Sequence, residues 1–430
     1  MFLSNLAKLN KKNHLEFDGC DVVDLAIHYG TPLVLMSETH IENAFADFKT
    51  AFNTYQGKSI VAYASKAFIC KEMCKLVAAQ GGWLDVVSGG ELFTAMQANF
   101  PMSKIFFHGN NKSLQELEMA IINEVGYIVI DNFGEIETLN ELAKKHNKIA
   151  KVLFRIKPGV DSKIHAKVQV GKIDSKFGFA LETGEAFEAV KAAAICKNLE
   201  IAGLHCHIGS NIHEAESFSL SAKVMLTFAK KLHDELNINI EILNLGGGFG
   251  IKYLETDEEF KAKELMIEIL AEITKFCNEN GMNKPTIAVE PGRYIAGPAG
   301  MNVYTIGNIK TIPNIRDYVA VDGSMCDNPR PALYGAKYTL EVANRANLPK
   351  DYKATVSGRL CETDTLHEDV MLQKCQPGDT LAVFSTGAYG FSMAMTYNRL
   401  QRPAVVFVKN GESRLAIKRE TYEQILQNDV

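Results

Sequence analysis

Eight short β-rich apolar runs, each followed by a helical or polar stretch, recur along the first 290 residues of this 430-residue chain. They cover residues 60–64, 83–87, 105–107, 127–130, 152–156, 201–204, 242–245 and 287–289. Several are apolar almost throughout, which is typical of parallel strands buried on both faces. Helical apolar spacing between runs is clearest over 135–146 and 218–236. This alternation predicts a (β/α)₈ barrel over residues 36–295. A doubly wound sheet is the alternative, although it usually needs fewer strands.

The last third of the chain has a different pattern. Beyond residue 296, β-rich runs at 318–321, 354–356, 380–384 and 404–408 dominate, and helical periodicity is scarce. Turn-forming residues at 376–379 and 409–412 separate these runs. We therefore expect an α/β barrel followed by a second, all-β domain of barrel or sandwich type over 296–430. Residues 1–35 are expected to join that β domain.

Charge and cysteine usage narrow the class of protein. Lys plus Arg number 46 and Asp plus Glu 51, so the net charge is −5, which does not favour a nucleic-acid partner. No apolar run approaches the ~18 residues of a membrane span, and the N-terminus lacks the pattern of a signal peptide. The nine cysteines form no Cys-x-x-Cys pair and are typical of reduced thiols. These features predict a cytoplasmic protein without a membrane or nucleic-acid partner.

In a (β/α)₈ barrel the active site lies at the carboxyl ends of the strands, so the residues that follow each run are the candidates. Lys66 follows the first run directly and is either a solvated loop lysine or a Schiff-base lysine. His205 and His207 end the sixth run and point to the same side of the strand. They could bind a metal if a third ligand converged on them, pack on a flat cofactor, or be core histidines.

Glycines and charged residues follow the last two runs. Gly246, Gly247 and Gly248 would let backbone N–H groups approach an anion closely, and the usual phosphate site of such barrels lies here. The segment matches neither a dinucleotide-binding nor a Walker motif. Glu290 precedes Arg293 and could hold a protonated ring nitrogen or form a surface ion pair with that arginine.

Three polar motifs stand in the β-rich region, at residues 330–335, 361–364 and 387–390. Cys361 lies beside Glu362 in a polar loop, which is unlike the setting of a buried structural cysteine. The other eight cysteines are expected to be inert. Cys70 and Cys74, four apart on an expected helix, are expected in the core.

Taken in this order, the motifs resemble the pyridoxal-phosphate (PLP) dependent decarboxylases of fold type III, which combine an alanine-racemase-like barrel with a β domain. The likeness runs from Leu15 to about Tyr397. Residues 16–21, 330–335 and 390–398 are most similar to the branch that decarboxylates diaminopimelate to lysine. The resemblance implies PLP as cofactor, no metal, and a small amino-acid substrate.

The resemblance also assigns roles to individual residues. Lys66 would bind PLP covalently, His207 would stack on its ring, and Asp85 would support both. Glu290 would pair with the ring nitrogen. The remaining cofactor contacts would come from Ser210, Gly246, Gly247, Gly248, Pro291, Gly292, Arg293 and Tyr389. The catalytic residues would be Lys66, His207, Glu290 and Cys361.

Substrate contacts are implied in the same way. Arg330, Tyr334 and Glu362 would hold the distal end of the substrate, and Arg293 and Tyr389 would touch it as well. Cys361 would be the proton donor. Because Cys361 and Glu362 come from the other subunit in this family, the resemblance implies a homodimer with shared active sites. An arginine suits a distal carboxylate, which diaminopimelate has and ornithine lacks.

Several positions depart from the family pattern. Asn244 stands where an Asp often precedes Leu-Gly-Gly-Gly. Residues 358–362 read Gly-Arg-Leu-Cys-Glu without the usual proline, and Thr363 and Asp364 follow in place of Ser-x-Asp. Residues 165–171 also differ. A decarboxylase of carboxynorspermidine, ornithine or arginine is therefore an alternative. A non-catalytic PLP-binding homologue and a metal-dependent barrel hydrolase are further alternatives.

Overall fold

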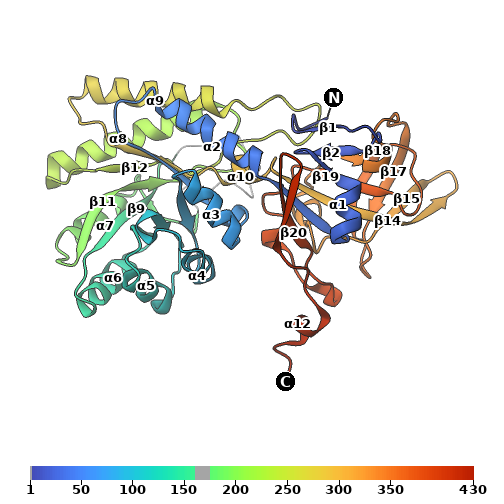
Figure 1. Ribbon diagram of the computed structural model, residues 1–430. Helices are drawn as coiled ribbons and strands as arrows, with labels where there is room; N and C mark the ends of the chain where they lie inside the picture. The colour runs from blue at the N-terminus through green and yellow to red at the C-terminus, as the bar shows by residue number, and fades with distance from the viewer. Residues whose placement is uncertain (1, 160–174) are drawn as a thin grey trace. The chain divides into compact units, whose positions relative to one another are not determined.

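The computed structural model describes residues 2–159 and 175–430 and forms two compact units. The barrel unit comprises Ala44–Gly250 and Phe260–Gly292. The β unit comprises Met1–Asn43, Ile251–Glu259 and Arg293–Val430. Figure 1 shows the elements of both units.

Parallel strands form the centre of the barrel unit. In chain order they are β5 (Ser59–Ala64), β6 (Trp83–Val86), β7 (Ile105–Phe107), β8 (Tyr127–Ile130), β9 (Ala150–Lys157), β11 (Leu199–Cys206), β12 (Ile242–Asn244) and β13 (Thr286–Val289). Each pairs with the next, and β13 pairs with β5, which closes the barrel. The short β10 (Phe179–Ala180) extends β9. All eight predicted strands are present, and the predicted barrel is confirmed.

Helices follow the strands around the barrel (Figure 1). They are α2 (Glu38–Phe52), α3 (Lys71–Ala79), α4 (Gly89–Gln97), α5 (Leu114–Ile122), α6 (Phe133–Lys145), α7 (Glu185–Ala194), α8 (Ala215–Leu236) and α9 (Ala262–Glu279). Polar side chains cap the N-termini of three of these helices, α4, α5 and α6. Ser88, Ser113 and Asn132 each accept a backbone N–H from the first turn. The helices predicted near 135–146 and 218–236 correspond to α6 and α8.

Side chains from the strands fill the interior of the barrel. Ala62 of β5, Phe106 of β7, Val129 of β8 and Leu153 of β9 belong to one buried cluster. The ring of Trp83 stacks on that of Phe106 with centroids 5.2 Å apart. The centre of the barrel is therefore a packed core and not a pore.

The β unit contains a sheet with the order β18-β17-β15-β14-β4-β20-β21. These strands are β18 (Thr365–Leu372), β17 (Tyr352–Ser357), β15 (Arg316–Val321), β14 (Gly300–Ile312), β4 (Leu33–Ser37), β20 (Ala404–Lys409) and β21 (Glu412–Ile417). Strands β16 (Leu340–Val342) and β19 (Thr380–Phe384) attach through β14. The predicted second, β-rich fold is confirmed.

The N-terminal segment contributes to this unit. Strand β4 pairs with both β14 and β20, so residues 33–37 lie inside the sheet. Ahead of it stand β1 (Ala7–Leu9), β2 (Leu15–Phe17), β3 (Cys20–Asp21) and α1 (Val22–Tyr29). The remaining helices are α10 (Gly292–Ala296), α11 (Arg330–Tyr334) and α12 (Tyr422–Leu426).

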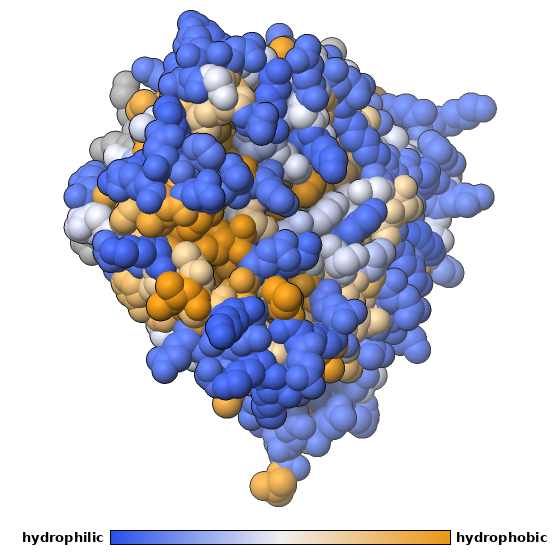
Figure 2. All heavy atoms as spheres, turned by 90° about the vertical axis from the view of Figure 1, so that its left-hand side faces the viewer, coloured by the Kyte–Doolittle hydropathy of each residue, from blue (hydrophilic) through white to orange (hydrophobic). Residues whose placement is uncertain are grey.

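The surface seen in Figure 2 is largely hydrophilic, with an apolar area near its centre. Exposed apolar side chains of the barrel unit include Ile122, Ile149 and Ile195. Among the described residues, no helix is long and apolar enough to cross a membrane.

Candidate active site

The predicted barrel residues all stand at or just after the carboxyl ends of strands. Lys66 lies in the short helix η1 (Ser65–Ala67) directly after β5, and Asp85 lies in β6. His205 is the second-last residue of β11, and Glu290 follows β13. Because parallel strand ends meet at one rim of a barrel, these side chains face a common space.

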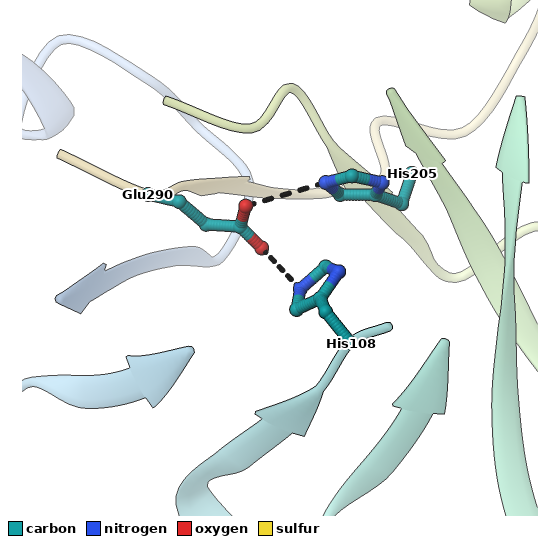
Figure 3. Close-up of side chains that lie close together, drawn as sticks. All are labelled: His108, His205 and Glu290. Carbon is teal, nitrogen blue, oxygen red and sulfur yellow. Dashed lines mark hydrogen bonds and ion pairs between the residues drawn. The ribbon is translucent and has the colours of Figure 1, made fainter. Parts of the chain in front are cut away.

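Glu290 is the centre of a buried hydrogen-bond cluster (Figure 3). Its Oε1 lies 2.8 Å from Nε2 of His108 and accepts a hydrogen bond of 2.7 Å from Nδ2 of Asn244. Its Oε2 lies 3.2 Å from Nε2 of His205. The carboxylate is thus held by groups from three other strand ends and cannot rotate freely.

The surroundings of Glu290 favour its charged form. Burial by itself raises the pKa of this carboxyl, but His108 and His205 outweigh burial and hold the pKa well below the usual value. Burial lowers the pKa of His205 to about 3, and the neighbouring Glu290 opposes this shift. Burial raises the pKa of Asp85 to about 6, with His108 opposing the shift.

A carboxylate has about four lone-pair sites, and among the described residues three side chains contact Glu290. Nearby, Oδ1 of buried Asp85 makes no hydrogen bond among the described residues. The charge of Lys66 favours the charged form of Asp85 and disfavours that of half-buried His207. Burial is the main reason why the pKa of His207 lies well below its usual value, and the charge of Lys66 lowers it further.

The glycine loop after β12 packs tightly against two neighbouring segments. A Cβ on Gly246 would lie 2.4 Å from the carbonyl oxygen of Cys206, and one on Gly247 would lie 2.3 Å from that of Glu290. Gly246 has a φ of +70°, which a side chain would strain. Only glycine therefore fits here, and the backbone of the loop stays open to a close approach.

Ser210, Pro291 and Gly292 lie in the segments that border this loop. Gly209 and Ile212, which flank Ser210, both contact Gly248, and the N–H of Ile212 donates to its carbonyl oxygen at 2.8 Å. Gly292 lies against the end of β5, because an added Cβ would be 2.9 Å from Cβ of Ala64. The predicted phosphate-loop residues are thus brought together with Glu290.

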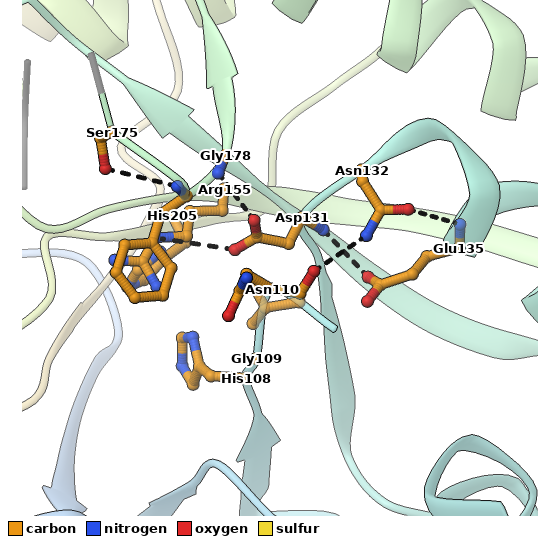
Figure 4. Close-up of polar contacts among 12 residues, drawn as sticks. His108, Gly109, Asn110, Asp131, Asn132, Glu135, Arg155, Ser175, Gly178 and His205 are labelled. Atoms are coloured by element: carbon orange, nitrogen blue, oxygen red, sulfur yellow. Dashed lines mark hydrogen bonds and ion pairs between the residues drawn. The ribbon is translucent and has the colours of Figure 1, made fainter. Parts of the chain in front are cut away.

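A second polar cluster extends the rim of the barrel (Figure 4). Oδ1 of Asp131 accepts the N–H of Gly178 at 2.8 Å, and its Oδ2 lies 3.9 Å from Nε of Arg155. The Arg155 guanidinium lies 4.1 Å from the centroid of the Phe177 ring. Burial lowers the pKa of Arg155, while the carboxylates of Asp131, Glu290 and Asp85 favour its charge.

The segment after His108 is fixed by a buried lysine. Nζ of Lys112 donates to the carbonyl oxygens of Gly109 at 2.6 Å and Val129 at 2.9 Å, and to Oε2 of Glu135 at 3.0 Å. All three ammonium donors thus have acceptors. Lys112 thereby joins the ends of β7 and β8, and so sets where His108 stands.

In the β unit, two arginines and several tyrosines form a cluster. The Arg330 guanidinium lies 5.7 Å from the ring centroid of Tyr389 and 5.6 Å from that of Tyr334. Its Nε donates to the hydroxyl of Tyr338 at 2.9 Å. Arg293 lies 4.9 Å from the Tyr389 centroid and donates to the hydroxyl of Tyr253. The predicted residues Arg293, Arg330, Tyr334 and Tyr389 are therefore neighbours.

The loop that carries Cys361 and Glu362 is exposed. It closes around Asp364, whose Oδ2 accepts the N–H of Leu360 at 3.0 Å and whose carbonyl oxygen accepts that of Gly358 at 2.8 Å. Asp364 has a φ of +40°, so this departure from the family pattern forms a tight turn. The departure at residues 165–171 lies outside the described residues.

Sequence reasoning missed several members of these clusters: His108, Lys112, Arg155, Asp131, Tyr253 and Tyr338. His108 and Asp131 stand at strand ends, so the rule that picked Glu290 could have found them. Two further potential metal ligands, His108 and Glu290, do converge on His205. Single atoms of His108, His205 and Glu290 lie within 4.8 Å of one another. Their mutual hydrogen bonds account for this arrangement.

Comparison with known proteins identifies the family. Residues 38–297 match the model for the pyridoxal-binding domain of pyridoxal-dependent decarboxylases. Curated diaminopimelate decarboxylases of Bacillus methanolicus and Bacillus subtilis are each 46% identical to this chain. The first alignment covers 98% of both chains, and the second covers 100% of this chain and 98% of the relative. The chain belongs to the diaminopimelate decarboxylase family.

Solved structures agree with that family membership. Diaminopimelate decarboxylase of M. jannaschii, in complex with L-lysine, has a TM-score of 0.92 at 33% identity and covers 100% of this chain and 99% of its own. The Helicobacter pylori enzyme, also with L-lysine, has a TM-score of 0.86 at 30% identity and covers 94% and 98%. The chain is thus a PLP-dependent carboxy-lyase of the diaminopimelate decarboxylase family, and the predicted family and cofactor are confirmed.

Proposed function

We propose that this chain decarboxylates meso-2,6-diaminopimelate to L-lysine and CO₂ with the barrel-rim residues described above. The observation that carries the proposal is the buried Glu290 carboxylate, which His108, His205 and Asn244 hold at the end of β13. A protonated ring nitrogen is a donor that suits such a carboxylate, and it would also balance the buried charge. The residues present therefore fit PLP.

When bound, PLP supplies an electron sink for the charge left at Cα when CO₂ departs. In this proposal Lys66 would bind the cofactor covalently and His207 would lie against its ring. Ser210 and the backbone of Gly246–Gly248 would hold the phosphate, together with residues 291–293. Asp85 and Arg155 set the charge beside Lys66.

The arginine–tyrosine cluster is proposed to hold the substrate. Because Tyr338 accepts from Nε of Arg330, the edge of the guanidinium left for a carboxylate is the pair of terminal nitrogens. This edge suits the distal carboxylate of diaminopimelate. Glu362 suits the distal ammonium, and Arg293, Tyr334 and Tyr389 line the same subsite. An ornithine-like substrate would leave Arg330 without its partner.

Cys361 is proposed to donate the proton to Cα after CO₂ leaves. Of the nine cysteines it alone is exposed in the single chain, and its neighbour Glu362 is exposed as well. Such exposure suits residues that act in a second subunit. We therefore propose a homodimer with shared active sites, located in the cytoplasm.

The test is CO₂ release by purified, PLP-loaded protein given meso-diaminopimelate, with ornithine, arginine and carboxynorspermidine in parallel. Release from diaminopimelate alone, with lysine as product, is the expected result. Release from one of the other three substrates would still be the reaction of a carboxy-lyase. It would attribute the substrate specificity to the stretches that differ from the family pattern, at residues 358–364 and 165–171. No release from any of them, despite bound PLP, would favour a non-catalytic PLP-binding role.

A further inference from the structure

Two consecutive residues hold the exposed loop that carries Cys361 and Glu362. Oδ1 of Asn398 accepts the backbone N–H of Cys361 at 3.2 Å. The hydroxyl of Tyr397 donates to Oε1 of Glu362 at 2.7 Å. Both residues belong to η6 (Tyr397–Arg399), a short turn over thirty residues further along the chain. Each of the two proposed functional residues thus has its own contact from this turn.

The turn and the loop are anchored to a common support. The carbonyl oxygen of Cys326 accepts the N–H of Met395 at 3.1 Å, which fixes the chain just before the turn. Oδ1 of Asp364 accepts the N–H of Met325 at 2.8 Å, which fixes the far end of the loop. Because both segments are tied to residues 325–326, their distance from each other is set by the fold.

The backbone of the turn also favours a specific residue. Asn398 has a φ of +52°, a left-handed conformation that asparagine adopts more readily than most residues. This conformation directs its short amide toward the loop. Gly358 completes the loop, because a Cβ there would lie 2.0 Å from Oδ2 of Asp364.

We propose that Tyr397 and Asn398 are positioning residues, Asn398 for the thiol of Cys361 and Tyr397 for the carboxylate of Glu362. The inference rests on the proposed function of those two residues. Asn398 fixes the backbone from which the thiol projects, so it governs proton delivery. Tyr397 occupies one oxygen of Glu362 and orients the other, so it governs recognition of the distal ammonium.

Hydrogen exchange tests the role of Asn398 without any activity measurement. In Asn398→Gly, which tolerates the positive φ, the amide of Cys361 should exchange about fivefold faster. The amide of Leu360, which Asp364 holds, should be unchanged and serves as the internal control. Asn398→Asp retains an acceptor oxygen and should restore protection. Equal acceleration at both amides, or none, would overturn the role of Asn398.

Kinetic measurements on Asn398→Gly distinguish an effect on proton delivery from an effect on substrate binding. Asn398→Gly should lower kcat for diaminopimelate several-fold, raise the solvent isotope effect on kcat, and leave KM near that of the wild type. A merely structural role would not change the isotope effect. An unchanged isotope effect in a slower variant would therefore count against positioning of the thiol.

Two substrates test the role of Tyr397. Tyr397→Phe removes one hydroxyl and should raise KM for diaminopimelate about fivefold with little change in kcat. For 2-aminopimelate, which lacks the distal ammonium, the same substitution should leave KM unchanged. Tyr422→Phe, on the exposed C-terminal helix, is the matched control. An equal rise in KM for both substrates would refute recognition through Glu362.

Failure of the proposed function and failure of the positioning inference give different experimental results. If wild-type protein releases no CO₂ from diaminopimelate, the proposed substrate is wrong, whatever the exchange data show. If wild-type protein is active but the exchange of Cys361 does not depend on Asn398, only the positioning inference fails.

Discussion

Nε2 of His108 lies 2.8 Å from Oε1 of Glu290 inside the barrel rim, with both side chains buried. This contact shows how the barrel keeps a carboxylate ionised out of water. Together with His205 and Asn244, His108 supplies the donors that offset the cost of burying the charge. In the proposed function this charge would pair with the ring nitrogen of PLP.

Glu290→Gln should retain PLP but lower kcat by about 10²–10³-fold, because the fixed negative charge beside the ring nitrogen is lost. His108→Ala should lower kcat by a smaller factor, and His108→Gln, whose amide can still donate, should recover part of it. The measurement is steady-state decarboxylation with PLP content determined for each variant. Wild-type kcat in Glu290→Gln would contradict the proposed pairing.

Gly246→Ala should weaken PLP binding by at least about tenfold, because the new Cβ would lie 2.4 Å from the carbonyl oxygen of Cys206 and displace the phosphate loop. Gly281→Ala is the matched control. Gly281 has a similar φ of +63°, but nothing lies within 4 Å of an added Cβ. Titration of the cofactor-free proteins with PLP gives both affinities, and equal weakening in the two variants would assign the effect to backbone strain alone.

Cys361→Ala should keep bound PLP and lose most turnover, and Lys66→Ala should lose covalent attachment of the cofactor. Mixing the two inactive proteins should restore up to about a quarter of wild-type activity if sites are shared, because half of the dimers are mixed and each has one intact site. Activity is measured after subunit exchange has been verified with tagged chains. Complete inactivity of verified mixed dimers would exclude shared sites.

His367→Leu should make stability less dependent on pH between about 4 and 6. Burial lowers the pKa of His367 to about 3, so its ring is neutral in the folded state. The unfolded chain binds this proton below about pH 6.5, so the free energy of unfolding falls as the pH falls through this range. Removing the imidazole should reduce that slope by about 1.4 kcal/mol per pH unit.

The slope is obtained from denaturant unfolding at several pH values. His28→Leu, at an exposed position, is the control and should keep the wild-type slope. An unchanged slope in His367→Leu would mean that the buried ring does not contribute to acid destabilisation.

Local signals in the sequence were enough for the barrel. Each strand is a short apolar run with its own boundary, so β5 and β13 could be located without knowledge of their neighbours. Lys66, His207 and Glu290 were picked as candidates in the same way, because the position of a residue at a strand end can be read from the chain alone. Cys361 and Arg330 depended on recognised motifs instead.

What the sequence by itself determined is therefore the order of elements, the strand-end residues and the family. Only the tertiary structure decided which of these residues meet. His108 and Glu290 are 182 residues apart, and their contact depends on the closure of the barrel between β13 and β5. Likewise, Tyr397 reaches Glu362 only because two loops share one support. Hydrogen bonds and charge–charge contacts act over a few ångströms, and such distances between remote residues are set by packing and not by local pattern.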